Sequence, residues 1–151
     1  MISALLVAAL AAAAPTAGAA PTAQYRTVVR VIDGDTILLD HNERVRLIGV
    51  DTPETVDPRK PVQRYGREAS AFTHRAVEHQ LVRLEPGWER RDKYGRTLAY
   101  VFRASDGFFL NAELIRQGYG HAMTRFPHPH MEAFRALERE AREARRGLWG
   151  P

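Results

Sequence analysis

Hydrophobic residues recur at two different spacings along the chain, and each spacing predicts a different kind of element. Residues 25–32 and 36–39 are rich in Val, Ile and Thr, and the turn-forming triplet 33–35 separates them, as in two strands joined by a tight turn. In residues 44–50, arginines alternate with aliphatic residues, which is typical of a half-buried strand. The first part of the chain therefore predicts three consecutive β-strands.

Farther along the chain, apolar residues recur every three or four positions, as one buried face of a helix requires. This pattern predicts helices over residues 65–79, 111–117 and 131–146. Two further strand-like runs, residues 81–84 and 98–102, lie between the first two helices and are separated by a charged segment. The expected set of elements is five strands and three helices.

The first 19 residues differ from the rest because they contain no charged side chain. Their apolar run is shorter than the roughly 18 to 20 residues that a membrane span needs, and Ala17 and Ala19 fit a signal-peptidase site. We therefore expect a signal peptide at residues 1–19, a folded domain at residues 20–151, and an exported protein that is periplasmic or secreted. An uncleaved anchor is the alternative, since no Lys or Arg precedes the apolar run.

Composition places the chain among ordinary globular proteins of one domain. It has 151 residues, of which 44% are hydrophobic and 26% are charged. The absence of cysteine excludes disulfides, thiolate nucleophiles and Cys-ligated metals. The net charge is +4; acidic residues dominate between 21 and 58 and basic residues between 59 and 103. Carboxylates that hold a cation beside cationic groups that bind anionic oxygens are typical of a metal-assisted phosphate site.

Several residues have the chemistry that such a site needs. The tetrapeptide 33–36 places two carboxylates at a turn and Asp51 ends the third predicted strand, so oxygen ligands suited to Ca²⁺ can converge there. Arg46 lies on the third predicted strand, and Arg96 stands just before a later one. Two arginines can bind one phosphate, each through two parallel hydrogen bonds. Each feature alone has a simpler interpretation, a tight turn for the tetrapeptide and a surface ion pair for either arginine.

Five motifs occur in order along the chain and combine these groups. They are Asp33-Gly34-Asp35-Thr36; Arg46-Leu47 with Val50-Asp51-Thr52-Pro53-Glu54-Thr55; Tyr65-Gly66-x-Glu68-Ala69-Ser70-Ala71-Phe72; Asp92-Lys93-Tyr94-Gly95-Arg96-x-Leu98-Ala99-Tyr100; and Arg116-Gln117-Gly118. The ordered set resembles the staphylococcal nuclease (thermonuclease) family over about residues 25–149. The resemblance implies an α+β fold, a five-stranded OB-fold β-barrel with three α-helices, which agrees with the elements predicted above. OB-folds commonly bind oligonucleotides.

The resemblance also implies a metal site and a catalytic set. Asp35 and Asp51 match the family's Ca²⁺ carboxylates, and Thr52 matches the residue that supplies a backbone carbonyl. Asp33 matches a carboxylate that supports these ligands without binding the ion itself. The remaining matches are Glu54 for the general base, and Arg46 and Arg96 for the arginines that bind the scissile phosphate.

Other matches imply contacts with the rest of the substrate. Lys93 and Tyr94 correspond to groups that contact the terminal phosphate of a bound nucleotide, and Arg59 and Lys60 keep the positive charge of a mobile loop over residues 55–62. The chain departs from the family's type member where two tyrosines flank the nucleotide base. Thr124 and Phe126 stand there, so only Phe126 offers a ring for stacking.

Two sets of rings receive a structural interpretation. His121, His128 and His130 lie close together in sequence, but their spacing fits no standard zinc site. Trp88 and Trp149 are interpreted as packing or partly exposed aromatics.

Together these observations predict a Ca²⁺-dependent nuclease that hydrolyses DNA and RNA with little sequence preference, because phosphate contacts contain no base information. From the resemblance we expect cleavage at P–O5′ that leaves 3′-phosphate ends, a preference for single-stranded or locally melted substrate, and a monomer without stable membrane association after signal cleavage. The alternative is a non-catalytic OB-fold module that binds nucleic acid or protein. A structural or regulatory envelope protein is a third possibility, supported only by the leader.

Overall fold

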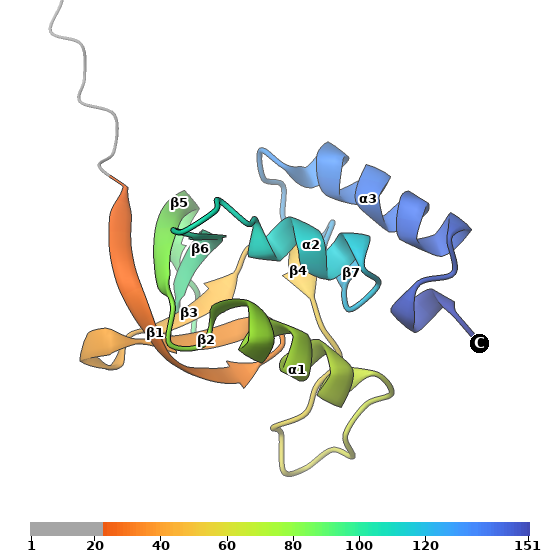
Figure 1. Cartoon of the computed structure of the whole chain (residues 1–151), viewed down its shortest axis with the longest axis horizontal. Coiled ribbons are helices and arrows are strands. Elements are labelled where there is room, and N and C mark those ends of the chain that lie inside the picture. Colours follow the sequence, from red (N-terminus) through yellow and green to blue (C-terminus); the bar gives the residue numbers. More distant parts are fainter. Residues whose placement is uncertain (1–22) are drawn as a thin grey trace, which may run out of the picture.

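A closed five-stranded β-barrel dominates the structure, a computed structural model that describes residues 23–151 (Figure 1). The strand order around the barrel is β1-β2-β3-β6-β5. Its strands are β1 (Gln24–Asp33), β2 (Thr36–Leu39), β3 (Arg44–Leu47), β5 (Leu81–Arg91) and β6 (Thr97–Arg103). The predicted signal peptide, residues 1–19, lies outside the described residues, so its cleavage stays a prediction.

The barrel closes because β1 pairs with two partners and β3 joins a strand that is distant in sequence. The long strand β1 is antiparallel to both β2 and β5, whereas β3 and β6 pair in parallel, with Val45 opposite Thr97. A parallel pair needs a long crossover connection, and residues 48–96 provide it. Alternate side chains of the strands point inward. The core contains Val28, Ile37, Leu39, Val45, Leu47, Val82 and Val101, together with helical residues such as Leu110, Leu114, Ile115 and Phe134.

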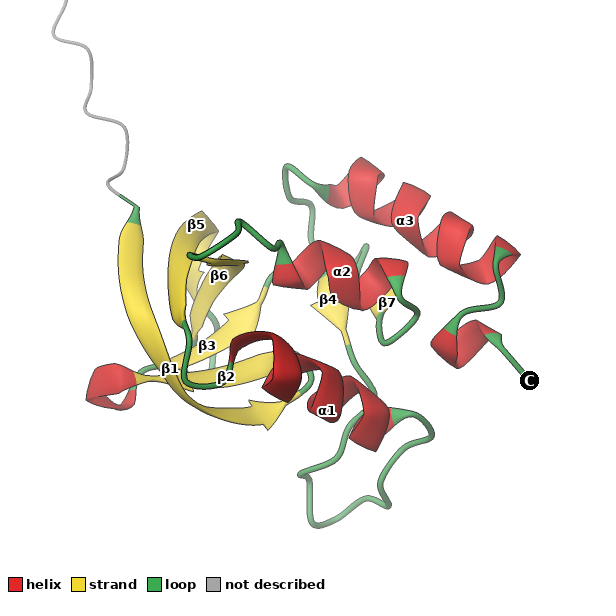
Figure 2. Cartoon of the chain, in the orientation of Figure 1, coloured by secondary structure: helices red, strands yellow, loops and turns green. Residues whose placement is uncertain are grey.

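Two of the three helices pack against the barrel and the third packs on its neighbour, as Figure 2 shows in red. They are α1 (Gly66–Val77), α2 (Leu110–Arg116) and α3 (Met131–Glu143), and two short 3₁₀ turns, η1 (Asp40–Asn42) and η2 (Gly147–Trp149), complete the set. Helix α1 contacts β1, α2 contacts β6, and α3 packs on α2. Within residues 23–151, no helix combines the length and the apolar character needed to cross a membrane. The predicted α+β barrel with three helices is confirmed.

The third predicted strand, residues 44–50, is wrong as a single element. Strand β3 ends at Leu47, and the chain turns at Gly49, which has a left-handed φ of +77°. A Cβ at this position would lie 2.6 Å from the His128 ring and 2.8 Å from Phe134, so both the conformation and the close approach require glycine. After the turn, β4 (Val50–Asp51) pairs with β7 (His121–Ala122) in a separate two-stranded sheet.

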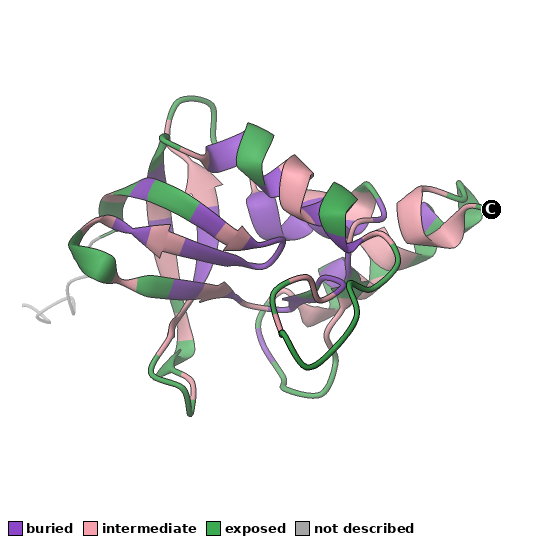
Figure 3. Cartoon of the chain, turned by 90° about the horizontal axis from the view of Figure 1, so that it is seen from below, coloured by how far each residue is buried: buried purple, intermediate pink, exposed green. Residues whose placement is uncertain are grey.

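Other boundaries also differ from the sequence prediction. Strand β5 continues to Arg91, although residues 85–91 were expected to connect two strands, because an irregular register lets it follow β6 past Pro86. Helix α3 ends at Glu143, three residues before the predicted end. Figure 3 shows the exposed segment that precedes α1 as a protruding loop, which agrees with the loop predicted at residues 55–62.

Candidate active site

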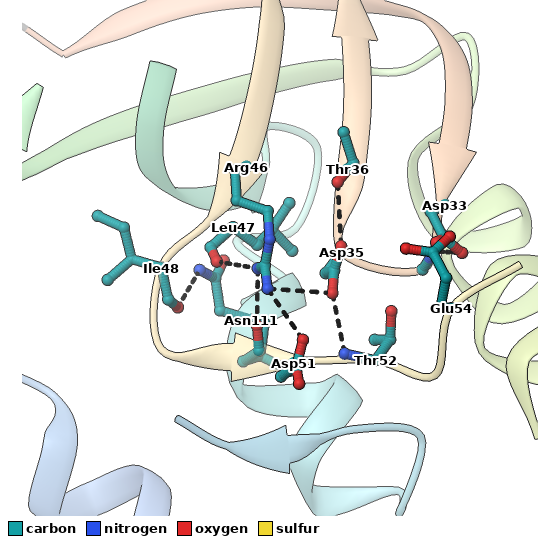
Figure 4. A network of polar contacts seen from close by, with 12 residues as sticks. Asp33, Asp35, Thr36, Arg46, Leu47, Ile48, Asp51, Thr52, Glu54 and Asn111 are labelled. Carbon is teal, nitrogen blue, oxygen red and sulfur yellow. Dashed lines mark hydrogen bonds and ion pairs between the residues drawn. The ribbon is translucent and has the colours of Figure 1, made fainter. Parts of the chain in front are cut away.

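The first part of the site forms where the turn between β1 and β2 meets the chain that leaves β4 (Figure 4). The carboxylate of Asp35 accepts hydrogen bonds from the Thr36 hydroxyl at 3.0 Å and from the Thr52 backbone N–H at 2.9 Å. Asp35 is buried, and burial of a polar group is costly unless the group is hydrogen-bonded. These bonds fix its direction relative to β4.

Arg46 links the two predicted metal-binding carboxylates. Its Nη2 atom lies 3.2 Å from Asp35 Oδ2 and 3.2 Å from Asp51 Oδ1. Its Nη1 atom donates to the backbone carbonyls of Leu47 and Val50, each at 2.7 Å. The side chain is only 12% exposed, so the planar guanidinium is held rigidly. No acceptor for its Nε–H is found within residues 23–151, so this group remains able to bind a ligand oxygen.

Asp33 and Glu54 form a second carboxylate pair beside the first. Figure 4 shows the two carboxylates pointing toward each other. Asp33 accepts hydrogen bonds from the Gly34 N–H at 2.9 Å and the Thr55 hydroxyl at 2.7 Å. Burial raises the pKa of Asp33 to about 6, with a smaller contribution from the negative charges of Asp35 and Glu54. Asp33 thus connects the β1–β2 turn to the start of the exposed loop.

Glu54 has the properties of an ionised base. Its Oε1 accepts the backbone N–H groups of Val56 at 2.7 Å and Asp57 at 3.2 Å. The hydrogen bond from Val56 is the largest cause of a lowered pKa at Glu54, and it outweighs the opposing effect of partial burial. The Glu54 backbone is also tied to Gln63, through bonds of 2.8 and 3.0 Å. Because both ends of the loop meet at Glu54, the loop and the carboxylate are positioned together.

The oxygen atoms at this place suit a hard cation. Asp35 and Asp51 converge on one nitrogen of Arg46, which shows that their carboxylates can share a positive charge. Partial burial raises the pKa of Asp51, and the charge of Asp35 raises it further, against the opposing effect of Arg46. Thr52 Oγ1 is buried nearby without a hydrogen-bond partner in the described chain. This donor set fits Ca²⁺ or Mg²⁺ better than softer metals.

The protein side chains alone do not complete the coordination of a cation. In the part of the chain that the structure describes, no three His, Cys, Asp or Glu side chains cluster as metal ligands would. A cation held here would therefore depend on the two aspartates, backbone oxygen such as that of Thr52, water and substrate. Open coordination of this kind is usual where a metal also contacts phosphate.

Arg96 lies in the turn that joins β5 to β6, immediately before β6 begins. Its Nε donates to Asp92 Oδ2 at 2.6 Å, and the same carboxylate accepts the backbone N–H groups of Tyr94 and Arg96. Burial of Asp92 opposes ionisation, but these hydrogen bonds outweigh it and lower its pKa. No acceptor within residues 23–151 binds the Nη atoms of Arg96. Asp92 therefore orients the guanidinium while leaving one edge available.

A groove of about 740 Å³ connects Arg46 with Arg96. Among the predicted substrate-binding residues, Lys93, Tyr94 and Phe126 also line it, so five of the predicted residues share one surface. The Lys93 ammonium and the Arg96 guanidinium lie 5.1 and 5.3 Å from the centre of the Tyr94 ring, within cation–π range. Two of the predicted substrate-binding residues, Arg59 and Lys60, do not line the groove, and neither do the predicted metal-binding residues or Glu54. Arg59 instead pairs with Asp57 in the exposed loop, at 3.0 Å.

Two residues that support the site were missed at the level of the sequence. Buried Asn111, in α2, accepts the Val101 N–H at 2.9 Å and donates to the carbonyl of Ile48 at 2.9 Å, just where β3 ends. Thr73, in α1, donates to the Gly34 carbonyl at 2.6 Å, at the turn that presents Asp35. The only sequence signal was a polar side chain within an apolar helical stretch.

Comparison with known proteins places the chain in a family. Residues 44–151 match the model of the staphylococcal nuclease homologues, so the chain belongs to this family. It is 44% identical over 130 residues to a thermonuclease of Staphylococcus hyicus, an alignment that covers 83% of this chain and 76% of the relative. It is 48% identical over 129 residues to a thermonuclease of Staphylococcus intermedius, covering 81% and 74%. The endonuclease YncB of Bacillus subtilis is 39% identical over 129 residues, covering 82% and 60%.

Proposed function

We propose that this protein is an exported, Ca²⁺-dependent nuclease that hydrolyses phosphodiester bonds of DNA and RNA at P–O5′ and leaves 3′-phosphate ends. The observation that supports it best is the position of Arg46. This arginine lies 3.2 Å from both Asp35 and Asp51 and lines the groove that it shares with Arg96. Family membership and the names of the thermonuclease and endonuclease relatives support nuclease activity.

Each side chain has a distinct task in this mechanism. Glu54 accepts a proton from the water whose oxygen attacks phosphorus, and its lowered pKa keeps it ionised for that step. The P–O5′ bond breaks as the new bond forms. Arg96 donates hydrogen bonds from its Nη groups to the departing O5′, which takes up a proton from solvent to become a hydroxyl. Arg46 donates from Nε to a non-bridging oxygen, whose charge grows in the transition state. Ca²⁺, bound by Asp35, Asp51 and the Thr52 carbonyl, would neutralise part of the phosphate charge.

The groove favours a single strand without a fixed base sequence. Its arginines and lysine are suited to bind phosphates, which are the same at every position of a nucleic acid. Phe126 is 63% exposed and offers one face to an unstacked base, whereas a base within a duplex is already stacked on its neighbours. We propose that the enzyme acts as a monomer on single-stranded or locally melted substrate, in the periplasm or outside the cell.

The test uses protein that starts at Ala20 and a single-stranded DNA labelled at one end. Cleavage is measured with Ca²⁺ and with chelator, and the ends are identified by whether a phosphatase removes a 3′-phosphate. The variants are Arg46→Ala, Arg96→Ala and Glu54→Gln, and Arg44→Ala is the matched control because Arg44 is an exposed arginine on the same strand as Arg46.

We expect cleavage that needs Ca²⁺, 3′-phosphate products, and losses of roughly 10²- to 10³-fold for each arginine variant at the site. Arg44→Ala retains full activity. Products with 5′-phosphate ends contradict the assignment of P–O5′ cleavage. Tight binding without any cleavage by the unmutated protein would support the non-catalytic binding module instead.

A further inference from the structure

Strand β5 contains a large bulge at one end of the groove. Pro86 pairs with Ala99 and Arg91 pairs with Thr97, so residues 87–90 of β5 lie opposite the single residue Leu98 of β6. Bulges re-aim side chains and are frequent beside functional sites. Proline in a strand is confined to edges and bulges because it cannot donate to the ladder, so Pro86 is consistent with the break in register here.

Trp88 lies in this bulge and points away from the core. Its side chain is 72% exposed, the largest exposure among the large hydrophobic residues of the described chain. Gly87 brings the bulge against Ile48, since a Cβ there would lie 2.5 Å from Ile48 Cδ1. Burial of an aromatic side chain stabilises a fold, so this exposed tryptophan adds little to stability by packing. Neither an aromatic stack nor a cation–π contact involves Trp88 within residues 23–151.

The groove that Trp88 lines is cationic as well as aromatic. Three of its cationic side chains, Arg91, Lys93 and Arg125, form no ion pair with any residue that the structure describes. Besides Trp88, two further exposed rings line the groove, those of Tyr94 and Phe126. Unpaired positive charge along an aromatic groove is complementary to a polyanion with flat, apolar bases. The volume of about 740 Å³ lies in the upper part of the roughly 300–1,000 Å³ range of small-ligand sites, which leaves room beyond one nucleotide.

We propose that Trp88 is a stacking platform for a base of single-stranded nucleic acid, at a nucleotide other than the one that contacts Phe126. This inference rests on the proposed function and adds to it a second subsite, away from the scissile phosphate. Two bases of an extended strand then stack on Trp88 and Phe126. The phosphates of the strand face the cationic side chains Arg91, Lys93 and Arg125. A substrate too short to reach both rings gains nothing from Trp88.

The first experiment compares a long and a short substrate. Trp88→Ala is expected to lower kcat/KM for a single-stranded oligonucleotide of about 12 nucleotides by roughly 5- to 150-fold, the effect of losing one stacked base. Hydrolysis of a mononucleotide nitrophenyl phosphodiester is expected to stay unchanged, and Trp88→Phe should recover most of the loss. Tyr25→Ala is the control, since Tyr25 is an aromatic residue of the barrel that is 56% exposed and does not line the groove.

The second experiment observes the ring directly and needs no hydrolysis. The chain has two tryptophans, so Trp149→Phe leaves Trp88 as the only one. We expect the oligonucleotide, added with chelator to prevent cleavage, to quench the Trp88 fluorescence, and a duplex of the same length to quench it less. In Trp88→Phe the remaining Trp149, which packs against Arg142 and His121, should show no quenching.

The results separate this inference from the proposed function. Absence of quenching, or an equal loss on the long and the short substrate in Trp88→Ala, overturns the platform even if the enzyme is an active nuclease. Quenching by a single strand in a protein that cleaves nothing supports the platform and rejects the nuclease.

Discussion

Replacing Arg46 with alanine is expected to weaken both the fold and the activity, because this arginine holds the site together. The guanidinium donates to the carbonyls of Leu47 and Val50 at 2.7 Å each. These carbonyls flank the turn at Gly49, where the chain leaves the barrel. The same group also lies 3.2 Å from the carboxylates of Asp35 and Asp51. Alanine removes all four contacts and leaves two negative charges facing each other.

The structure gives the size of the effect on stability. A hydrogen bond that involves a charged group contributes about 1.5 to 3 kcal/mol, so two such bonds suggest about 3 kcal/mol at the low end of the range. The low end applies because water can reach this place past the exposed Asp51, and the ion pair with Asp51 itself adds only about 0 to 1 kcal/mol. With an m-value of about 2 kcal/mol/M, the urea midpoint should fall by about 1.5 M.

The assay combines urea unfolding in the presence of chelator with hydrolysis of single-stranded DNA in Ca²⁺. Arg46→Lys is a second variant that separates charge from geometry. Lysine keeps the positive charge but lacks the planar guanidinium that contacts two carbonyls and two carboxylates at once. We expect Arg46→Lys to lose activity almost as strongly as Arg46→Ala, while Arg44→Ala changes neither property. An Arg46→Ala protein as stable as the unmutated one refutes the structural part of the reasoning, and an unchanged hydrolysis rate refutes the catalytic part.

Three further predictions concern groups around the site. Asn111→Ala should lower the free energy of unfolding by about 3 kcal/mol, measured by urea unfolding, because the Val101 N–H and the Ile48 carbonyl lose their partner. A decrease of less than about 1 kcal/mol would argue against this role. Thr73→Val should cost about 1 to 2 kcal/mol and weaken Ca²⁺ binding measured by calorimetry, since the hydroxyl fixes the turn at Gly34; unaltered Ca²⁺ affinity would show that the turn holds itself. His128 has a pKa lowered by burial and by His130, so the folded state binds fewer protons than the unfolded state and stability should fall as the pH drops below about 6.5. His128→Gln should flatten that decline, and an identical pH profile would exclude His128 as its source.

The elements and their types could be predicted from the sequence because they depend on local patterns. Alternating residues in β3 and the repeat of apolar positions in α1 reflect how each segment meets the core. A strand and a helix form there, although the strand ends at Leu47. The ordered motifs also brought Asp35, Arg46, Asp51 and Arg96 together as candidates. In the structure, Arg46 contacts both aspartates and lines one groove with Arg96.

Element ends and supporting contacts were less predictable because they depend on distant residues. The apolar run continues past Leu47 to Val50, but the ring of His128 and the side chain of Phe134 require the chain to turn at Gly49. The extension of β5 to Arg91 depends on β6 as its partner. No local spacing marks Asn111 as the residue that binds Ile48, 63 positions earlier.

The sequence by itself determined the kinds of element, the family resemblance and the chemical groups available to the site. Only the tertiary structure decided that β3 and β6 pair in parallel, that Arg46 spans both aspartates, and that a bulge exposes Trp88 beside the groove. The division has a physical reason. Periodicity records whether a residue faces the core or the solvent, whereas a binding site depends on which distant segments the closed barrel brings into contact, and local patterns hold no information about that choice.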